Sequence, residues 1–303
     1  MTPSASSPAM NLKTWSLLAL LAFIWGGSFL FARIAVLEVP PLTLVFFRVA
    51  IAAVALHIYL ASRGQRLSGS GGLWLAFAGM GLLNNIIPFS LIFYGQQEIG
   101  AGLAAIINAM TPIWTLLIAH RFTADEHLST SKIVGIVLGF TGVAALIGPD
   151  AIGGLSGSTL AQIAVLGATI SYGCAGVFGK RFAAVSPVQT ATGQLTLSSL
   201  IMLPIAAFAD RFWFLDLPSL PAILSILALA LVCTAFAYIL FFRILASSGA
   251  VNISLVTLLV PVSAIILGAI VLGETLKPMQ FAGMAFILLG LIIIDGRTIR
   301  RYT

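Results

Sequence analysis

Charged residues are scarce in this chain of 303 residues. Asp, Glu, Lys and Arg together make up 8% of it, whereas 60% of the residues are hydrophobic. A soluble domain of ordinary composition carries about 25% charged residues. Together with the mean hydropathy of +1.11, this shortage excludes water as the solvent for most of the surface. The composition therefore predicts a polytopic membrane protein in a lipid bilayer.

Cysteine and midspan carboxylates are also in short supply. Cys174 and Cys233 are the two cysteines, both in apolar segments and far apart in the chain. They are interpreted as small packing residues and give no information on the redox compartment. The middle of each apolar segment lacks Asp and Glu. This argues against proton antiport through a buried carboxylate relay and leaves coupling through substrate groups or histidine open.

Motifs for intramembrane catalysis are missing too. The chain has no HExxH zinc motif and no pair of midspan aspartates. The GLSG at residues 154–157 is similar to the serine motif of rhomboid proteases, but it falls in a predicted loop. We therefore expect no enzyme, no catalytic residue, no cofactor and no metal site.

The basic residues are spread singly and in pairs between apolar runs, so the net charge of +6 does not indicate a nucleic-acid partner. They do indicate orientation, because cytoplasmic loops are enriched in Lys and Arg. With a cytoplasmic N-terminus, eleven basic residues face the cytoplasm: Lys13, Arg63, Arg66, Arg121, Lys132, Lys180, Arg181, Arg243, Arg297, Arg300 and Arg301. Three face the other side: Arg33, Arg211 and Lys277. We expect a multi-pass protein of the bacterial inner (plasma) membrane with both termini in the cytoplasm.

Ten apolar segments of about 20 residues fit the length needed to cross a bilayer. They lie near residues 13–33, 42–61, 72–94, 99–119, 131–149, 159–180, 187–208, 220–243, 248–271 and 278–296. Lys13 and the apolar run after it could imitate a signal peptide. They are interpreted as a retained first span, because no small-residue cleavage site follows and the segment recurs later.

The two halves of the chain resemble each other at an offset of 146 to 149 residues. Residues 100–119 align with 249–268, which pairs Gly100 with Gly249 and Pro112 with Pro261. Residues 25–33 likewise align with 172–180. Each half has five spans, an odd number, so the second half must enter the membrane inverted. The predicted fold class is an all-α polytopic membrane protein of ten transmembrane helices in two inverted five-helix repeats.

The repeated motifs identify a family resemblance. Glu126–Leu128 and Glu274–Leu276 form a paired E-x-L, each followed seven residues later by Gly135 or Gly283, and the second span reads RVAIAA. In these features the chain resembles the EamA family of the drug/metabolite transporter superfamily, and its sequence also resembles the bacterial aromatic amino acid exporters. The resemblance implies a central substrate cavity near the midplane and alternating access. The expected domains are a disordered tail (1–12), a first EamA-like repeat (13–149), a connecting loop (150–158), a second repeat (159–296) and a basic C-terminal tail (297–303).

Three prolines interrupt apolar spans, each four residues after a polar residue. A proline inside a helix cannot donate to the carbonyl four residues earlier, so Pro88, Pro112 and Pro261 free the backbone oxygens of Asn84, Asn108 and Thr257. Such oxygens must face protein or a water-filled cavity. Interrupted segments at matching places in two halves point to a transport site. The alternative is a packing kink whose polar group bonds to a neighbouring helix.

Polar and aromatic residues at helical spacing extend the predicted cavity wall. The candidate substrate-binding residues are Trp25, Ser28, Asn84, Asn85, Tyr94, Asn108, Thr111, Thr115, Tyr172, Thr234, Tyr238 and Thr257. For any one aromatic, and for Tyr94 above all, helix packing or an interfacial belt is the alternative.

Arg48 is the one charged residue well inside a span, and its repeat mate is the neutral Gln194. An intramembrane arginine is costly and functional by default. It could attract a substrate carboxylate, or have a structural or gating role. We group it with Pro88, Pro112 and Pro261 as kink or gating positions.

The predicted function is export of small organic metabolites by a secondary transporter. Aromatic or other apolar amino acids are the expected substrates, and cationic drugs, other metabolites or a passive channel-like pore are the alternatives. The expected partners are a small-molecule substrate and the lipid bilayer. The glycines of the fifth and tenth spans permit close helix approach, either within the bundle or in a dimer, so the oligomeric state stays open.

Overall fold

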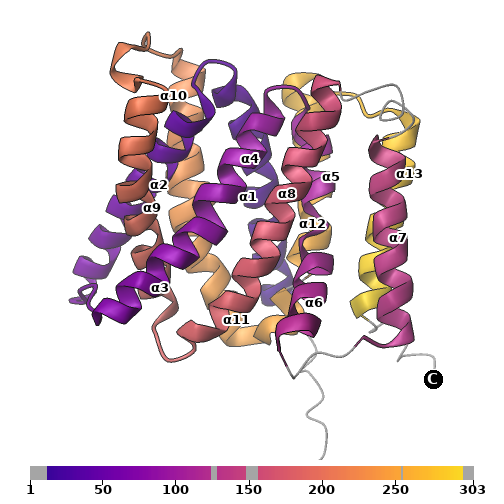
Figure 1. The fold of residues 1–303 in the computed structure, drawn as a ribbon, viewed down its shortest axis with the longest axis horizontal. Coiled ribbons are helices and arrows are strands. Elements are labelled where there is room, and N and C mark those ends of the chain that lie inside the picture. The colour runs from indigo at the N-terminus through magenta and orange to yellow at the C-terminus, as the bar shows by residue number, and fades with distance from the viewer. Residues whose placement is uncertain (1–11, 124–127, 148–155, 254, 296–303) are drawn as a thin grey trace, which may run out of the picture.

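The computed structural model describes residues 12–123, 128–147, 156–253 and 255–295, and every regular element in these ranges is a helix. Nine helical segments among them are long and apolar enough to cross a membrane, and a shorter apolar helix makes the tenth. The predicted fold class is confirmed: ten transmembrane helices form two inverted five-helix repeats (Figure 1).

The elements follow the predicted spans. The first half contains α1 (Leu12–Val36), α2 (Pro41–Ser62), α3 (Gly71–Gly81), the π-helical η1 (Leu82–Ile86), α4 (Ile87–Gln96), α5 (Ala101–Asn108), α6 (Thr111–Phe122) and α7 (Thr130–Ile147). The second half contains α8 (Gly157–Phe178), the 3₁₀ turn η3 (Gly179–Phe182), α9 (Pro187–Ala209), the 3₁₀ turn η4 (Phe212–Phe214), α10 (Leu220–Leu227), the π-helical η5 (Ala228–Phe236), α11 (Ala237–Ile253), α12 (Val256–Leu272) and α13 (Pro278–Asp295).

Some boundaries differ from the expected ones. The ninth span was predicted to begin at 248, but α11 runs through Ile253 and α12 begins at Val256. α1 begins at Leu12 and α8 at Gly157, both inside stretches assigned to a tail or loop. Residues 1–11, most of the connecting loop and residues 296–303 lie outside the described residues.

Local chemistry explains where several helices begin. The hydroxyls of Ser70, Ser156 and Ser219 accept hydrogen bonds from the backbone N–H three residues later, at 3.4, 3.3 and 3.4 Å. Such serine caps satisfy an otherwise unpaired N–H of the first helical turn. Pro41 and Pro187 occupy the first turns of α2 and α9, where a missing N–H costs nothing. Ser156, the serine of GLSG, is therefore a helix cap.

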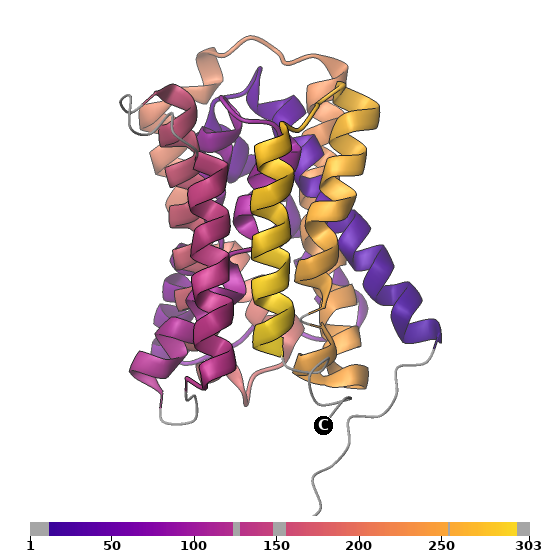
Figure 2. The same cartoon turned by 90° about the vertical axis from the view of Figure 1, so that its right-hand side faces the viewer.

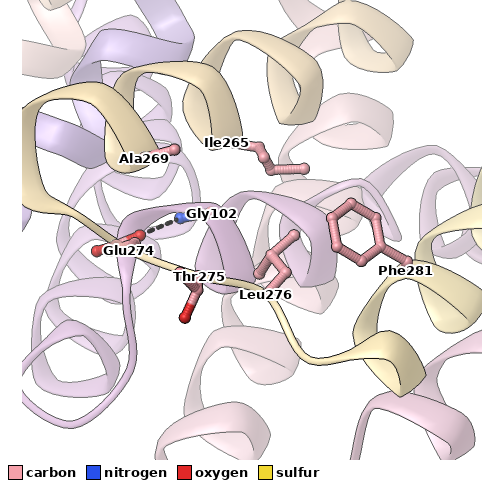
Figure 3. A pocket seen from close by; sticks show the side chains of 7 residues that line it. All are labelled: Gly102, Ile265, Ala269, Glu274, Thr275, Leu276 and Phe281. Carbon is pink, nitrogen blue, oxygen red and sulfur yellow. Dashed lines mark hydrogen bonds between the residues drawn. The ribbon is translucent and has the colours of Figure 1, made fainter.

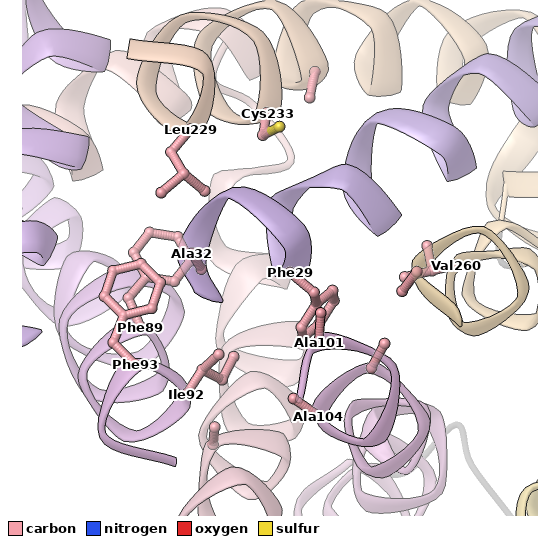
Figure 4. Packing of buried hydrophobic residues seen from close by; sticks show 14 of the residues in the cluster. Phe29, Ala32, Phe89, Ile92, Phe93, Ala101, Ala104, Leu229, Cys233 and Val260 are labelled. Atoms are coloured by element: carbon pink, nitrogen blue, oxygen red, sulfur yellow. The ribbon is translucent and has the colours of Figure 1, made fainter. Parts of the chain in front are cut away.

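The packing of the helices follows the inverted repeat. α1 packs on α12, and the repeat-related pair α8 and α6 does the same. α2 packs on α9, and α7 packs on α13. Figure 1 shows these two pairs at opposite sides of the bundle. The core between them is apolar: Figure 4 shows Ala32 of α1 beside Phe89 of α4, and Phe29 of α1 beside Ala101 of α5.

Glycines allow the closest of these contacts. A Cβ added at Gly135 on α7 would lie 2.5 Å from the carbonyl oxygen of Gly290 on α13, and one at Gly142 would lie 2.6 Å from that of Gly283. Gly135 and Gly283 are repeat mates, as are Gly142 and Gly290, so the inverted repeat exchanges the two contacts. These glycines pack within the bundle.

The two ends of the bundle are distinct. α1 begins and α13 ends at the same end, which we call the terminal end (Figure 2). The other end carries the turns that follow α1, α4, α9 and α12, and we call it the distal end.

Candidate functional site

Two adjacent asparagines form the centre of a buried polar network. Asn84 and Asn85 lie in η1, directly before Pro88, where the backbone widens to a π-helical turn because the proline has no N–H. Asn84 Nδ2 donates to Tyr238 Oη at 2.9 Å and to Gln194 Oε1 at 3.3 Å. Tyr238 Oη in turn donates to Asn85 Oδ1 at 3.3 Å. Helices of the third, seventh and eighth spans therefore meet in one network at mid-depth.

Ser198 extends this network on α9. Asn85 Nδ2 donates to Ser198 Oγ at 3.1 Å, and Ser198 Oγ donates to the carbonyl of Gln194 at 2.7 Å. Asn85, Gln194 and Ser198 are all buried. Leaving a buried polar group unpaired costs free energy, so the network stabilises the relative positions of three spans from both halves.

Arg48 lies against this network from α2. Its Nε donates to Thr234 Oγ1 at 3.0 Å, and its guanidinium lies 3.8 Å from the ring centroid of Phe89. Tyr172 and Tyr238 are within electrostatic reach of its charge. Arg48 is 7% exposed, and among the described residues no carboxylate pairs with it. A buried cation that uses one of its five N–H donors on a described residue is suited to hold an anionic group.

The two π-helical segments occupy corresponding places in the repeat. Residues 82–86 of η1 match positions within η5 at the repeat offset. η5 supplies Thr234, whose Oγ1 also donates to the carbonyl of Leu229 at 2.8 Å. π-Helical turns inside α-helices are frequent at functional sites. Here each one presents a network residue to the interior.

An aromatic series leads from the network to α1. Tyr238 stacks on Phe242 with ring centroids 6.2 Å apart, Phe242 contacts Phe241 at 5.3 Å, and Phe241 contacts Trp25 at 5.6 Å. Trp25 is the repeat mate of Tyr172, so the two halves contribute an aromatic residue each. These rings offer apolar surface beside the charge of Arg48.

The NAMTPIW segment at 108–114 breaks its span. α5 ends at Asn108 and α6 begins at Thr111. Pro112 frees the backbone carbonyl of Asn108, but this carbonyl already accepts a hydrogen bond from Thr111 Oγ1 at 2.9 Å. It is therefore not an open acceptor for a ligand. The side-chain Oδ1 of Asn108 is instead buried with no hydrogen-bond partner in the part of the chain that the structure describes. Thr115 repeats the local bond to the carbonyl of Thr111 at 2.9 Å.

The structure brings some predicted residues together and leaves others apart. Hydrogen bonds of the network join five of them: Arg48 to Thr234, and Asn84 and Asn85 to Tyr238. Tyr172 lies within electrostatic reach of Arg48. Trp25 is connected to Tyr238 through the aromatic series. Ser28 is half-buried on α1 and Thr257 is half-buried in the first turn of α12. Thr115 packs against Gly173 and Gly176 of α8. Tyr94 is 45% exposed, within electrostatic reach of Asp210 at the distal end.

Three network residues were absent from the sequence-based set: Gln194, Ser198 and Phe89. Gln194 is the repeat mate of Arg48, and this relation was a signal that could have identified it. Ser198 follows one helical turn later on the same face. Phe89 follows Pro88 directly, and nothing in the sequence indicates that its ring receives a guanidinium.

The distal end joins the two halves through carboxylates. Glu38 accepts hydrogen bonds from the backbone N–H and the hydroxyl of Ser219, at 2.7 and 2.6 Å. Asp210 accepts both the N–H and the hydroxyl of Thr43, each at 2.8 Å. The Ser219 bonds hold the pKa of Glu38 below its ordinary value. This pair is therefore intact at neutral pH and weakens only as the pH falls through that lowered pKa.

Glu274 makes the third such contact. Its carboxylate accepts the N–H groups of Ala101 and Gly102 at 2.8 and 3.1 Å, so it caps α5 of the first half and not the helix that follows it (Figure 3). A carboxylate is favoured at a helix N-terminus. Its repeat mate, Glu126, lies outside the described residues. A pocket of about 280 Å³ opens beside Glu274 and is lined by Ile265, Leu276 and Phe281 among others.

Comparisons with known proteins agree with this architecture. The model of the EamA-like transporter family matches residues 13–148 and 159–295. A "Probable amino-acid metabolite efflux pump" of Salmonella typhimurium is 28% identical over 307 residues, covering 96% of this chain and 98% of the relative. The "Uncharacterized inner membrane transporter YedA" of Escherichia coli K12 is 29% identical and covers 90% and 88%. The "Uncharacterized transporter YoaV" of Bacillus subtilis is 25% identical and covers 89% and 92%. A crystal structure that is 16% identical superimposes with a TM-score of 0.66 over 94% of this chain and 98% of that one.

Proposed function

The chain belongs to the EamA-like transporter family, and from this premise we propose that it exports aromatic or other apolar amino acids by alternating access. It is a multi-pass membrane protein, and its relatives are named as transporters or amino-acid metabolite efflux pumps. The substrate cavity of this proposal is centred on the network around Arg48.

The unneutralised charge of Arg48 is the observation that carries the proposal. In a low-dielectric interior a buried charge needs a partner, and a substrate carboxylate supplies one. Asn85 Oδ1 and Tyr238 Oη are hydrogen-bond acceptors for the substrate ammonium group. The rings of Trp25 and Phe241 form an apolar surface for its side chain. A cationic drug would instead be repelled by Arg48.

We also propose that the terminal end faces the cytoplasm. The positive-inside rule supports this orientation, because eleven basic residues belong to that side and three to the other. A cysteine introduced at Arg66, on the terminal end, is expected to react with a membrane-impermeant maleimide in inverted vesicles. Reaction in intact spheroplasts would contradict the orientation. The same substitution at Arg211, on the distal end, is the matched control and should react only in spheroplasts.

Substitutions at Tyr238, in the network, and at Asn108, on the fourth span, test the cavity. Tyr238→Ala removes the hydroxyl that joins Asn84 to Asn85, and Asn108→Ala removes the unpartnered buried Oδ1. Each is expected to lower the rate of L-phenylalanine counterflow in proteoliposomes about tenfold, which corresponds to about 1.4 kcal/mol, the scale of one hydrogen bond. The rate is measured per mole of reconstituted protein, so reduced expression does not enter.

Tyr94→Ala is the matched control, because Tyr94 lies outside the network, and it should transport at the wild-type rate. If Tyr238→Ala and Asn108→Ala both keep full counterflow, the proposed cavity is wrong. Flux that rises linearly with concentration and shows no counterflow would indicate a passive pore. No flux of any substrate would indicate a structural membrane subunit.

A further inference from the structure

A second pocket of about 380 Å³ lies at the distal end, well away from Arg48 in the fold. The turn before α5, the end of α7, the start of α8 and the turn before α13 surround it. Ile99, Leu103, Leu146 and Met279 form its apolar wall. The volume falls in the range of small-molecule sites.

Three polar side chains that line this pocket have no hydrogen-bond or ion-pair partner among the described residues. Gln162 is 7% exposed, and its Oε1 is buried without a hydrogen bond. The carboxylate of Glu98 and the ammonium of Lys277 form no ion pair or hydrogen bond with any described residue. A buried amide oxygen without a partner costs about 1–3 kcal/mol. The pocket thus presents an unmatched acceptor, an anion and a cation.

The backbone around the two charges is well defined. Gly273 ends α12 in the left-handed conformation, with φ +66°, and Glu274 then binds the start of α5. Gln280 Oε1 accepts the backbone N–H of Lys277 at 2.8 Å. On the facing side, Glu98 Oε2 would lie 3.4 Å from a Cβ added at Gly157, so its carboxylate is next to the start of α8.

We propose that this distal pocket is a second binding site for a zwitterionic amino acid. Lys277 binds the carboxylate, Glu98 and the Oε1 of Gln162 bind the ammonium group, and the apolar wall receives the side chain. A ligand with only one of the two charges would leave the other pocket charge unpaired. This inference rests on the proposed function, because it gives the same substrate class a separate site at the end opposite the termini.

Equilibrium binding of radiolabelled L-phenylalanine to the purified full-length chain in lipid nanodiscs at neutral pH tests the site. The wild type is expected to bind two molecules per chain. Glu98→Gln and Lys277→Gln should each weaken the distal site about tenfold or more, the loss of one charge-assisted contact, and leave one site. Tyr238→Ala should remove the central site and leave the distal one.

Two variants at the same end are matched controls. Asp216→Asn and Arg211→Gln each remove an exposed charge that does not line the pocket, and both should keep two sites. Phenethylamine lacks the carboxylate and phenylpropionate lacks the ammonium group. Neither should displace L-phenylalanine from the distal site in Tyr238→Ala as well as unlabelled L-phenylalanine does.

The outcomes separate the two proposals. One site in the wild type, lost in Tyr238→Ala and kept in Lys277→Gln, would overturn the distal site and leave the proposed function standing. One site lost in Lys277→Gln and kept in Tyr238→Ala would support the distal site and contradict the central cavity. Displacement by phenethylamine as strong as that by L-phenylalanine would overturn the zwitterion assignment. Absence of L-phenylalanine binding in every variant would overturn both.

Discussion

Arg48→Gln is expected to lower L-phenylalanine counterflow about 100-fold, which corresponds to about 2.7 kcal/mol. Glutamine keeps a polar head near Thr234 but removes the positive charge that we assign to the substrate carboxylate. Charge-assisted hydrogen bonds contribute about 1.5–3 kcal/mol, and the low dielectric around Arg48 strengthens them. Arg48→Lys keeps the charge but loses the forked geometry, so we expect a loss of about tenfold. The measurement is the initial counterflow rate in proteoliposomes.

Thr234→Val separates the two roles considered for Arg48. This variant removes the acceptor of the one hydrogen bond that Arg48 makes to a described side chain and leaves the charge in place. If Arg48 acts on the substrate, Thr234→Val should transport within about threefold of the wild type, since a neutral hydrogen bond contributes about 1 kcal/mol or less. If Thr234→Val loses as much activity as Arg48→Gln, Arg48 acts by joining α2 to η5, and the carboxylate assignment is wrong.

Gly26→Ala is expected to destabilise the bundle by about 1–3 kcal/mol, the usual cost of overpacking a well-packed interior. A Cβ at Gly26 on α1 would overlap Ser263 Oγ and lie 2.8 Å from the backbone nitrogen of Ala264 on α12. Ser263 cannot move aside freely, because its hydroxyl donates to the carbonyl of Ala22 at 2.8 Å. The measurement is the apparent melting temperature of the purified protein in one detergent.

The neighbouring glycine is the matched control. A Cβ at Gly27 would meet the far ends of Phe31 and Leu267 at 3.6 and 3.8 Å, which are ordinary contacts, so Gly27→Ala should melt within about 1 °C of the wild type. Gly173 is the repeat mate of Gly26, and a Cβ there would lie 3.0 Å from the backbone nitrogen of Thr115. Gly173→Ala should therefore also be destabilising. Equal melting temperatures for Gly26→Ala and Gly27→Ala would show that α1 and α12 separate without cost.

The spans and the inverted repeat could be predicted from sequence because both depend on periodic, local signals. Apolar length identifies a crossing, and Gly and Pro at a fixed offset identify the second copy. The start of the ninth span was wrong for a physical reason. Residues 246–255 are apolar or small except for Asn252, and they contain neither a proline nor a charge, so hydropathy alone does not show where α11 stops.

The site was harder to predict because its bonds are long-range. Asn84, Tyr238 and Thr234 carry a local signal, a polar group at midspan, and the sequence indicated them. The partners that satisfy them lie in other spans, and only the relation of Gln194 to Arg48 indicated one. The carbonyl freed by Pro112 was interpreted as open to the cavity. Thr111, three residues after Asn108, satisfies it locally, as hydroxyl side chains in membrane helices can.

Pro112 and Pro261 occupy matching positions in the repeat, but the backbone around them differs. The first half breaks between α5 and α6, whereas α12 runs unbroken through Pro261. One sequence pattern thus shows two backbone forms in a single molecule. In a carrier that opens alternately to the two sides of the membrane, the opposite-facing state could use the same two backbone forms, the broken helix and the continuous helix. Each half would then adopt the backbone form that the other half has in this structure. The fourth span would become a continuous helix, and the ninth would break near Pro261.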